Sequence, residues 1–259
     1  MQLWSPTHVK TLLPSFIVMI AVGALLRFFL IKKSERIRMI PFQLIAVFIF
    51  VIEIFKQVKE FTSPTGYDLY SVPLHFCSLF IFMLPLMGFY NGKHKDKVRG
   101  ITTALNGSLF LVMAIFPTII YSDRAIQGSL TNFWDFHTTF FHVFATFEFV
   151  LIVMLDLHKP SPKKDSKAIL IFVICYCAIA SIMAQILKTN FNNFYECNVP
   201  PLESGRLWAI ATLGKVFGQT IYVVLASIAN VLVVLTAYQF YRLMRLIVHK
   251  ISKPFHKYD

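Results

Sequence analysis

Charged residues are scarce in this sequence. Of its 259 residues, only 15% are Asp, Glu, Lys or Arg, whereas a typical soluble domain carries about a quarter. Hydrophobic residues make up 56% of the chain, and several apolar runs reach the ~20 residues that a helix needs to cross a bilayer core. The shortage of charge therefore excludes an ordinary soluble domain and predicts an integral membrane protein.

Acidic residues are rarer than basic ones, with 13 against 25 and a formal net charge of +12. The basic residues lie in short connections between apolar runs, which is typical of membrane topology and of contact with anionic lipid headgroups. The aromatic residues are mostly Phe, with 27 copies, which suits lipid contact and helix packing better than base stacking. We therefore expect lipid headgroups as partners and no nucleic acid.

The compact signatures of several enzyme classes are missing. The sequence has no glycine-rich phosphate loop, no G-x-S-x-G and no H-E-x-x-H, the patterns of nucleotide-binding proteins, serine hydrolases and zinc proteases. We expect no cofactor. A metal site would have to gather ligands from separate helices, and the candidates are His75, His137, His142, Glu53 and Glu148.

Hydropathy predicts an all-α fold: a single domain over 1–259 with seven transmembrane helices. The predicted spans are about 11–32, 39–57, 71–90, 99–121, 134–156, 167–188 and 216–243.

Loop charge predicts the orientation. The connections 31–38, 92–99 and 158–167 each hold four basic residues and one acidic residue, and the tail after the last span is basic. The intervening connections near 58–70, 122–133 and 189–215 are close to neutral. By the positive-inside rule the N-terminus is outside and the C-terminus cytoplasmic, in a multi-pass protein of the cell membrane.

This topology places ionisable and amide side chains of four spans in the outer half of the membrane. They are His75 and Cys77, Asp135, His137 and His142, Glu53 and Lys56, and Gln185, Lys188 and Asn190. Such groups are costly in lipid unless they are paired or hydrated, so they usually face a bundle interior or a cavity. Glu53 and Lys56, one turn apart, have the simpler option of neutralising each other.

Helical phase separates two neighbours in the third span. On span 134–156 a polar stripe that includes Thr138 and His142 predicts that His142 faces the bundle. On a regular helix Cys77 points about 160° away from His75, although Pro73 can make the first turn irregular.

A thiol beside a histidine can form a nucleophile–base pair, in which the imidazole takes the proton and the thiolate attacks a carbonyl carbon. Cys77 can equally be a small buried hydrophobic residue, or pair with Cys197 in an oxidising compartment. The connection 189–215 is either an exposed loop or a lid that contacts substrate.

The segment "VPLHFCSLFIFMLPL" resembles the P-L-H/Q-x-C segment of the bacterial YwaF-like integral membrane proteins, which are related to the animal transmembrane protein 164. The resemblance continues in "LNGSLFLVMAIFPTII", "DFHTTFFHVFATF" and "NFNNFYECNVPP". The animal relatives are described as acyltransferases that move a fatty acyl chain between phospholipids with a cysteine and a histidine. The resemblance implies Cys77 and His142 in those roles, and it includes Asn192 and Tyr195 in an Asn/Tyr element.

These observations favour a membrane lipid acyltransferase or transacylase acting on phospholipids or other acylated lipids. Cys77 is the expected nucleophile, His142 the base, and His75 the group that orients or stabilises the oxyanion. The residues expected to line the substrate site are Glu53, His137, Thr138, Asn190, Asn192 and Tyr195. Two alternatives remain open: a transport or ligand-binding protein that uses the same polar cluster, and an accessory subunit in which the cluster only binds helices together.

Overall fold

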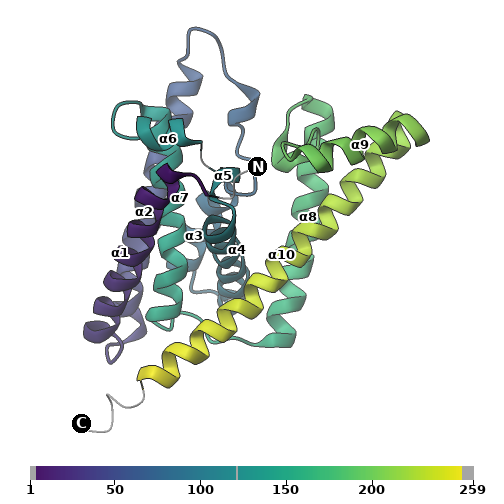
Figure 1. Cartoon of the computed structure of the whole chain (residues 1–259). Helices are drawn as coiled ribbons and strands as arrows, with labels where there is room; N and C mark the ends of the chain where they lie inside the picture. The colour runs from purple at the N-terminus through teal and green to yellow at the C-terminus, as the bar shows by residue number, and fades with distance from the viewer. Residues whose placement is uncertain (1–3, 121, 253–259) are drawn as a thin grey trace.

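The computed structural model describes residues 4–120 and 122–252, and all the regular secondary structure in those two ranges is helical (Figure 1). The helices are α1 (Pro6–Leu30), α2 (Glu35–Phe61), η1 (Leu69–Ser71), α3 (Leu79–Phe89), α4 (Lys95–Ile115), α5 (Pro117–Ile120), α6 (Asp123–Gly128), α7 (Phe133–Met154), α8 (Pro162–Leu187), η2 (Phe191–Asn193), α9 (Pro200–Leu213) and α10 (Lys215–Ser252). The all-α prediction is confirmed.

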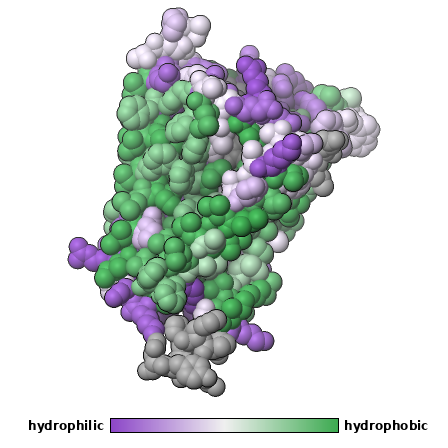
Figure 2. All heavy atoms as spheres, turned by 60° about the vertical axis from the view of Figure 1, so that its left-hand side comes forward, coloured by the Kyte–Doolittle hydropathy of each residue, from purple (hydrophilic) through white to green (hydrophobic). Residues whose placement is uncertain are grey.

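Six helices in the described part of the chain are long and apolar enough to cross a membrane: α1, α2, α4, α7, α8 and α10. Figure 2 shows apolar side chains over the middle of one face, with hydrophilic ones gathered toward its two ends. That band is the surface expected of a protein that spans a bilayer.

The third predicted span, 71–90, is only partly a helix. Residues 72–78 form consecutive turns, and α3 begins at Leu79. With 11 residues, α3 is ~17 Å long at 1.5 Å per residue, about half the thickness of a bilayer core. Pro73 lies in the irregular part and has no backbone N–H to donate to a helix. The prediction of a regular helix at Cys77 and His75 is therefore wrong, and a helical phase angle does not apply to these two residues.

Helices α2, α3, α4 and α7 form a four-helix bundle in which each packs against two others of the set. Its interior is filled by apolar side chains such as Phe42, Phe80, Leu105 and Leu151, all fully buried. Helix α1 packs on α7, while α8 and α10 pack on α4. The carboxyl group of Glu148 is also fully inside, and neither of its oxygens has a hydrogen-bond partner among the described residues.

Two aspartates hold the end of the molecule that carries the basic connections, the buried Asp165 and the half-buried Asp156. Asp165 accepts hydrogen bonds from His158 (3.0 Å), from the backbone N–H of Ser161 (2.7 Å) and from the Tyr238 hydroxyl. Asp156, after α7, accepts from Arg245 of α10 at 2.6 Å. Burial alone would raise the pKa of Asp156, but the hydrogen bond and charge of Arg245, with His249 also 3.3 Å away, outweigh it and hold that pKa below its usual value.

The opposite end holds residues 62–78, α6 and α9, and we call it the α9 end (Figure 1). Part of the expected 189–215 connection is helical here, as η2 and α9. Helix α10 has 38 residues, ~57 Å at 1.5 Å per residue, and runs diagonally across the molecule (Figure 1). It is longer than the predicted span 216–243, and it carries α9 on its first turns.

Candidate functional site

A buried carboxylate on α2 organises the polar residues at the α9 end. Glu53 is 4% exposed. Its Oε2 lies 2.8 Å from Nε2 of His137 on α7, and its Oε1 accepts from Gln57 (2.7 Å) and Lys56 (3.3 Å). The expected pairing of Glu53 with Lys56 is present, and His137 joins it. Three donors around one carboxylate match the requirement that a buried charge be paired and hydrogen-bonded.

The irregular segment 72–78 is anchored from two helices. Gln57 of α2 donates to the carbonyl of Ser71 (2.9 Å), and the Ser71 hydroxyl donates to Glu60 (2.7 Å). From α8, the Tyr176 hydroxyl donates to the carbonyl of Leu74 (3.1 Å). These bonds satisfy backbone groups that a helix would otherwise have satisfied internally, so the segment holds a defined shape without being helical.

The charge of Lys56 acts on all three residues expected to carry the chemistry. Cys77 and His75, from the irregular segment, each interact electrostatically with Lys56. His142 of α7 interacts with Lys56 and with His75. Cys77, His75 and His142, from two separate parts of the chain, thus all lie within electrostatic range of one ammonium group.

Hydrogen bonds to backbone carbonyls determine the tautomers of two histidines. Nδ1 of His142 lies 2.7 Å from the carbonyl oxygen of Thr138, and Nε2 of His75 lies 2.9 Å from that of Tyr70. A carbonyl oxygen only accepts, so Nδ1 of His142 and Nε2 of His75 carry hydrogen. In the neutral rings the nitrogens that can accept a proton are therefore Nε2 of His142 and Nδ1 of His75.

An apolar groove runs beside this cluster between α2 and α3. It has a volume of about 310 Å³, and Phe50, Phe61, Ile81 and Phe82 are among its apolar lining residues. Pro73 from the irregular segment, together with Glu53 and Gln57, also lines it. The groove therefore connects the surface of two apolar helices with the polar network around Glu53.

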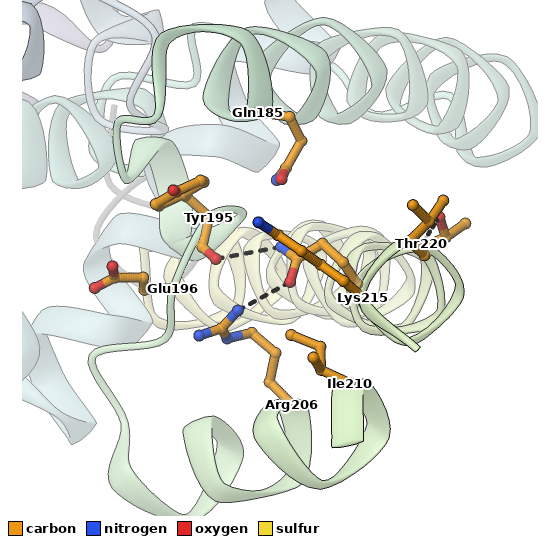
Figure 3. Close-up of a pocket in the computed structure, with 9 residues that line it drawn as sticks. Gln185, Tyr195, Glu196, Arg206, Ile210, Lys215 and Thr220 are labelled. Atoms are coloured by element: carbon orange, nitrogen blue, oxygen red, sulfur yellow. Dashed lines mark hydrogen bonds between the residues drawn. The ribbon is translucent and has the colours of Figure 1, made fainter. Parts of the chain in front are cut away.

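The Asn and Tyr side chains expected at the substrate site take other partners. Asn192 donates to Asn230 of α10 (3.1 Å), and Asn190 donates to Asn198 (3.5 Å). Tyr195 lines a second pocket, between η2, α9 and α10 (Figure 3). The contact from this segment to the histidines is made by Phe191, whose ring centroid lies 5.3 Å from that of His75.

Comparison with known proteins identifies the family. A model of the TMEM164 family matches residues 3–243. The chain belongs to the TMEM164 family. This confirms the relationship that the short motifs indicated. Together with the six apolar helices, membership of the TMEM164 family shows a multi-pass membrane protein. No curated protein and no solved structure matches the chain.

The alternatives for the cysteines can be examined in this TMEM164-family structure. All four cysteines are free, so Cys77 and Cys197 are not bonded to each other. Cys175 is exposed on α8 and Cys177 is buried. Across residues 4–120 and 122–252, no three His, Cys, Asp or Glu side chains are grouped in a way that could hold a metal ion.

Sequence reasoning missed Gln57 and Tyr176, which hold the irregular segment in place. Gln57 follows Glu53 by four residues, so helical spacing already puts the two on one face of α2. Tyr176 lies far away in the chain, at the middle of a predicted span, and nothing in its local sequence points to Leu74. The sequence also gives no sign that Lys56 interacts electrostatically with Cys77, His75 and His142, because its spacing from Glu53 indicates only an ion pair within α2.

Proposed function

We propose that this TMEM164-family protein is a lipid acyltransferase or transacylase with Cys77 as nucleophile and His142 as base. The observation that supports the proposal is that Cys77, His75 and His142 all lie within electrostatic range of Lys56, at the end of the molecule where an apolar groove lies between α2 and α3. A thiol, a proton acceptor and a cation in one place are the minimum needed for acyl transfer through a thioester.

In the first step Cys77 Sγ attacks the carbonyl carbon of a phospholipid acyl ester. The S–C bond forms, the ester C–O bond breaks, and the thiol proton passes through Nε2 of His142 to the leaving glycerol oxygen. The products are a lysophospholipid and a thioester on Cys77. His142 suits this role because its Nδ1–H is tied to the carbonyl of Thr138, which leaves Nε2 as the accepting nitrogen of the neutral ring.

In the second step a hydroxyl group of another lysolipid attacks the thioester carbonyl carbon. The new C–O bond forms and the C–S bond breaks, while the hydroxyl proton returns through His142 to Sγ. The cycle regenerates the free thiol and requires neither a metal ion nor a soluble cofactor. Both reactants are membrane lipids, so both can arrive laterally through the bilayer.

Lys56 is the group best suited to stabilise the negative charge that develops on sulfur and on the carbonyl oxygen. Neutral His75 uses its N–H on the carbonyl of Tyr70, so it has no second N–H for an oxyanion. We therefore assign His75 a positioning role for the irregular segment, and Lys56 the electrostatic role. Glu53 accepts from Lys56 and is itself bonded to His137 of α7, so it holds the ammonium group in place.

The groove between α2 and α3 is the proposed path for an acyl chain. Its walls are apolar except at Glu53 and Gln57, which line it midway along α2, so the ester of a chain lying in it would meet the polar network there. We further propose that the α9 end faces outward and the basic end the cytoplasm of the cell, where exposed lysines such as Lys32 and Lys33 contact anionic headgroups.

The test uses purified full-length protein in phosphatidylcholine vesicles that contain a phospholipid with a radiolabelled acyl chain. We expect a labelled protein adduct that hydroxylamine removes, together with release of lysophospholipid. Cys77→Ala should abolish the adduct, and His142→Gln should lower its rate by about 100-fold or more, the usual contribution of a positioned base.

The matched controls are Cys175→Ala, a cysteine exposed on α8, and His94→Gln, a histidine at the basic end. Both should label like the wild type. An adduct that persists in Cys77→Ala would rule out this nucleophile. Saturable lipid binding without any adduct or lysolipid in the wild type would instead favour a transport or ligand-binding protein.

A further inference from the structure

The junction of α9 and α10 encloses a pocket that the acyl-transfer site does not use. Gly214 alone separates the two helices, and the pocket between them and the 194–196 segment has a volume of about 400 Å³. Its walls include Gln185 of α8, Tyr195, Arg206 of α9, and Lys215 and Gln219 of α10 (Figure 3).

The pocket is shaped by a fixed hydrogen-bond frame. Arg206 donates to Glu203 (Nε to Oε2, 2.7 Å) and to Gln219 (2.9 Å), and Gln219 donates to the backbone carbonyls of Phe194 (2.9 Å) and Tyr195 (3.2 Å). Helices α9 and α10 are also in close contact: a Cβ added to Gly218 would lie 2.5 Å from the carbonyl of Ala209. The pocket is therefore pre-formed.

Within the pocket the charge of Lys215 is not neutralised by this hydrogen-bond frame, so the pocket carries a positive charge. Glu203 neutralises Arg206, whereas the ammonium group of Lys215 points into the pocket between Tyr195 and Gln185 (Figure 3). The carboxylate of Glu196 is turned away from Lys215 and Arg206 in the same view (Figure 3). The first turn of α10 also lines the pocket, and the start of a helix adds a partial positive charge. An anionic group fits this environment.

Large apolar side chains are exposed at the same junction. Trp208 is 67% exposed, and Leu202, Leu207, Val216 and Phe217 are also exposed. In Figure 1, α9 lies across the end of α10 rather than along the direction of the bundle helices. An exposed Trp next to membrane-spanning helices is typical of the level of the lipid headgroups.

We infer that this pocket binds the phosphate of a phospholipid headgroup, with Lys215 as the charged contact and Gln185 and Tyr195 as polar neighbours. Phosphate is the anion present at the level of the headgroups, where the exposed Trp208 places α9. The inference rests on the proposed function in one respect, that the ligand is a phospholipid. It adds a second lipid-binding site, separate from the groove between α2 and α3.

The test measures binding to full-length Cys77→Ala protein in detergent, so that no acyl transfer consumes the ligand. The probe is dihexanoyl-phosphatidylglycerol, titrated by calorimetry, with dihexanoylglycerol as its phosphate-free counterpart and inorganic phosphate as a competitor. We expect saturable binding of the phospholipid, and Lys215→Gln should weaken it about tenfold, as for the loss of one charge-assisted contact. Lys215→Arg should retain most of the affinity.

Lys188→Gln is the control, because Lys188 is an exposed lysine that ends α8 at the same end of the molecule and does not line the pocket. It should bind like the parent protein. Unchanged affinity in Lys215→Gln, equal binding of dihexanoylglycerol, or full displacement by equimolar inorganic phosphate would each overturn the inference. If the protein transfers acyl chains but does not bind the phospholipid at this pocket, only the further inference fails. If it binds the phospholipid but transfers no acyl chain, only the proposed function fails.

Discussion

Removing the carboxylate of Glu53 should lower the free energy of unfolding more than any other single change considered below. In Glu53→Ala three donors lose their acceptor at once, namely His137 at 2.8 Å, Gln57 at 2.7 Å and Lys56 at 3.3 Å. Breaking a buried ion pair by removing one partner costs about 3–5 kcal/mol, since the other charge is left uncompensated. Glu53→Gln keeps the volume and one accepting oxygen, so its cost should be smaller, about 1–3 kcal/mol.

A double-mutant cycle isolates the contact between Glu53 and His137. We expect Glu53→Gln and His137→Gln to be non-additive in the free energy of unfolding, with a coupling of about 0.5–3 kcal/mol for two residues in direct contact. The measurement is reversible unfolding of the purified protein in mixed micelles of a mild detergent and dodecyl sulfate. Glu196→Gln, an exposed carboxylate at the same end, is the control and should change the free energy by no more than about 0.5 kcal/mol.

The same variants connect stability with the irregular segment. Gln57 bonds both Glu53 and the carbonyl of Ser71, so loss of the carboxylate should loosen residues 72–78 and speed the alkylation of Cys77 by a membrane-permeant reagent. Additive free energies in the cycle, together with an unchanged alkylation rate, would refute the view that Glu53 organises this end of the protein.

Three further predictions concern the core and the basic end. Gly100→Ala should destabilise the protein by about 1–3 kcal/mol by overpacking, because its Cβ would lie 2.9 Å from a carboxylate oxygen of Asp165; thermal unfolding in detergent measures it, and an unchanged midpoint would contradict it. Glu148→Leu should raise the midpoint, since it removes two buried oxygens without partners among the described residues; a lower midpoint would show that Glu148 has a partner. Because the pKa of Asp156 is held below its usual value, its contribution to stability is complete above the unfolded-state pKa of about 3.9 and is lost as the pH falls through the folded-state pKa. An acid unfolding series should show this loss in the wild type and a smaller one in Arg245→Gln.

The spans could be predicted because they depend on local composition. A run of ~20 apolar residues is costly to leave in water wherever it lies in a fold. The predicted span 39–57 lies within α2, and 134–156 nearly coincides with α7. The exception is 71–90, which is apolar throughout but helical only from Leu79. Hydropathy measures the preference of a segment for lipid and not its backbone conformation, so it could not show that the carbonyls of Ser71 and Leu74 are bonded to Gln57 and Tyr176 instead.

The site was predictable in part for the same reason. Loop charges and span directions placed Glu53, His75, Cys77 and His142 at one end of the molecule, since both are properties of single segments. That Cys77 and the two histidines all lie within electrostatic range of Lys56 depends on how α2, α7 and the irregular segment are placed. Helical periodicity shows which side of a helix is polar, but not which neighbour it meets.

By itself the sequence determined an all-α membrane protein, the course of most of its spans and the end at which polar side chains accumulate. Only the packing of the helices shows that hydrogen bonds from α2 and α8 fix the non-helical conformation around 72–78. The same packing places Arg206 and Lys215 in the walls of a pocket between α9 and α10. The physical reason is that burial and charge act on each segment locally, whereas pairing of donors, acceptors and ions depends on ångström-scale distances between segments far apart in the chain.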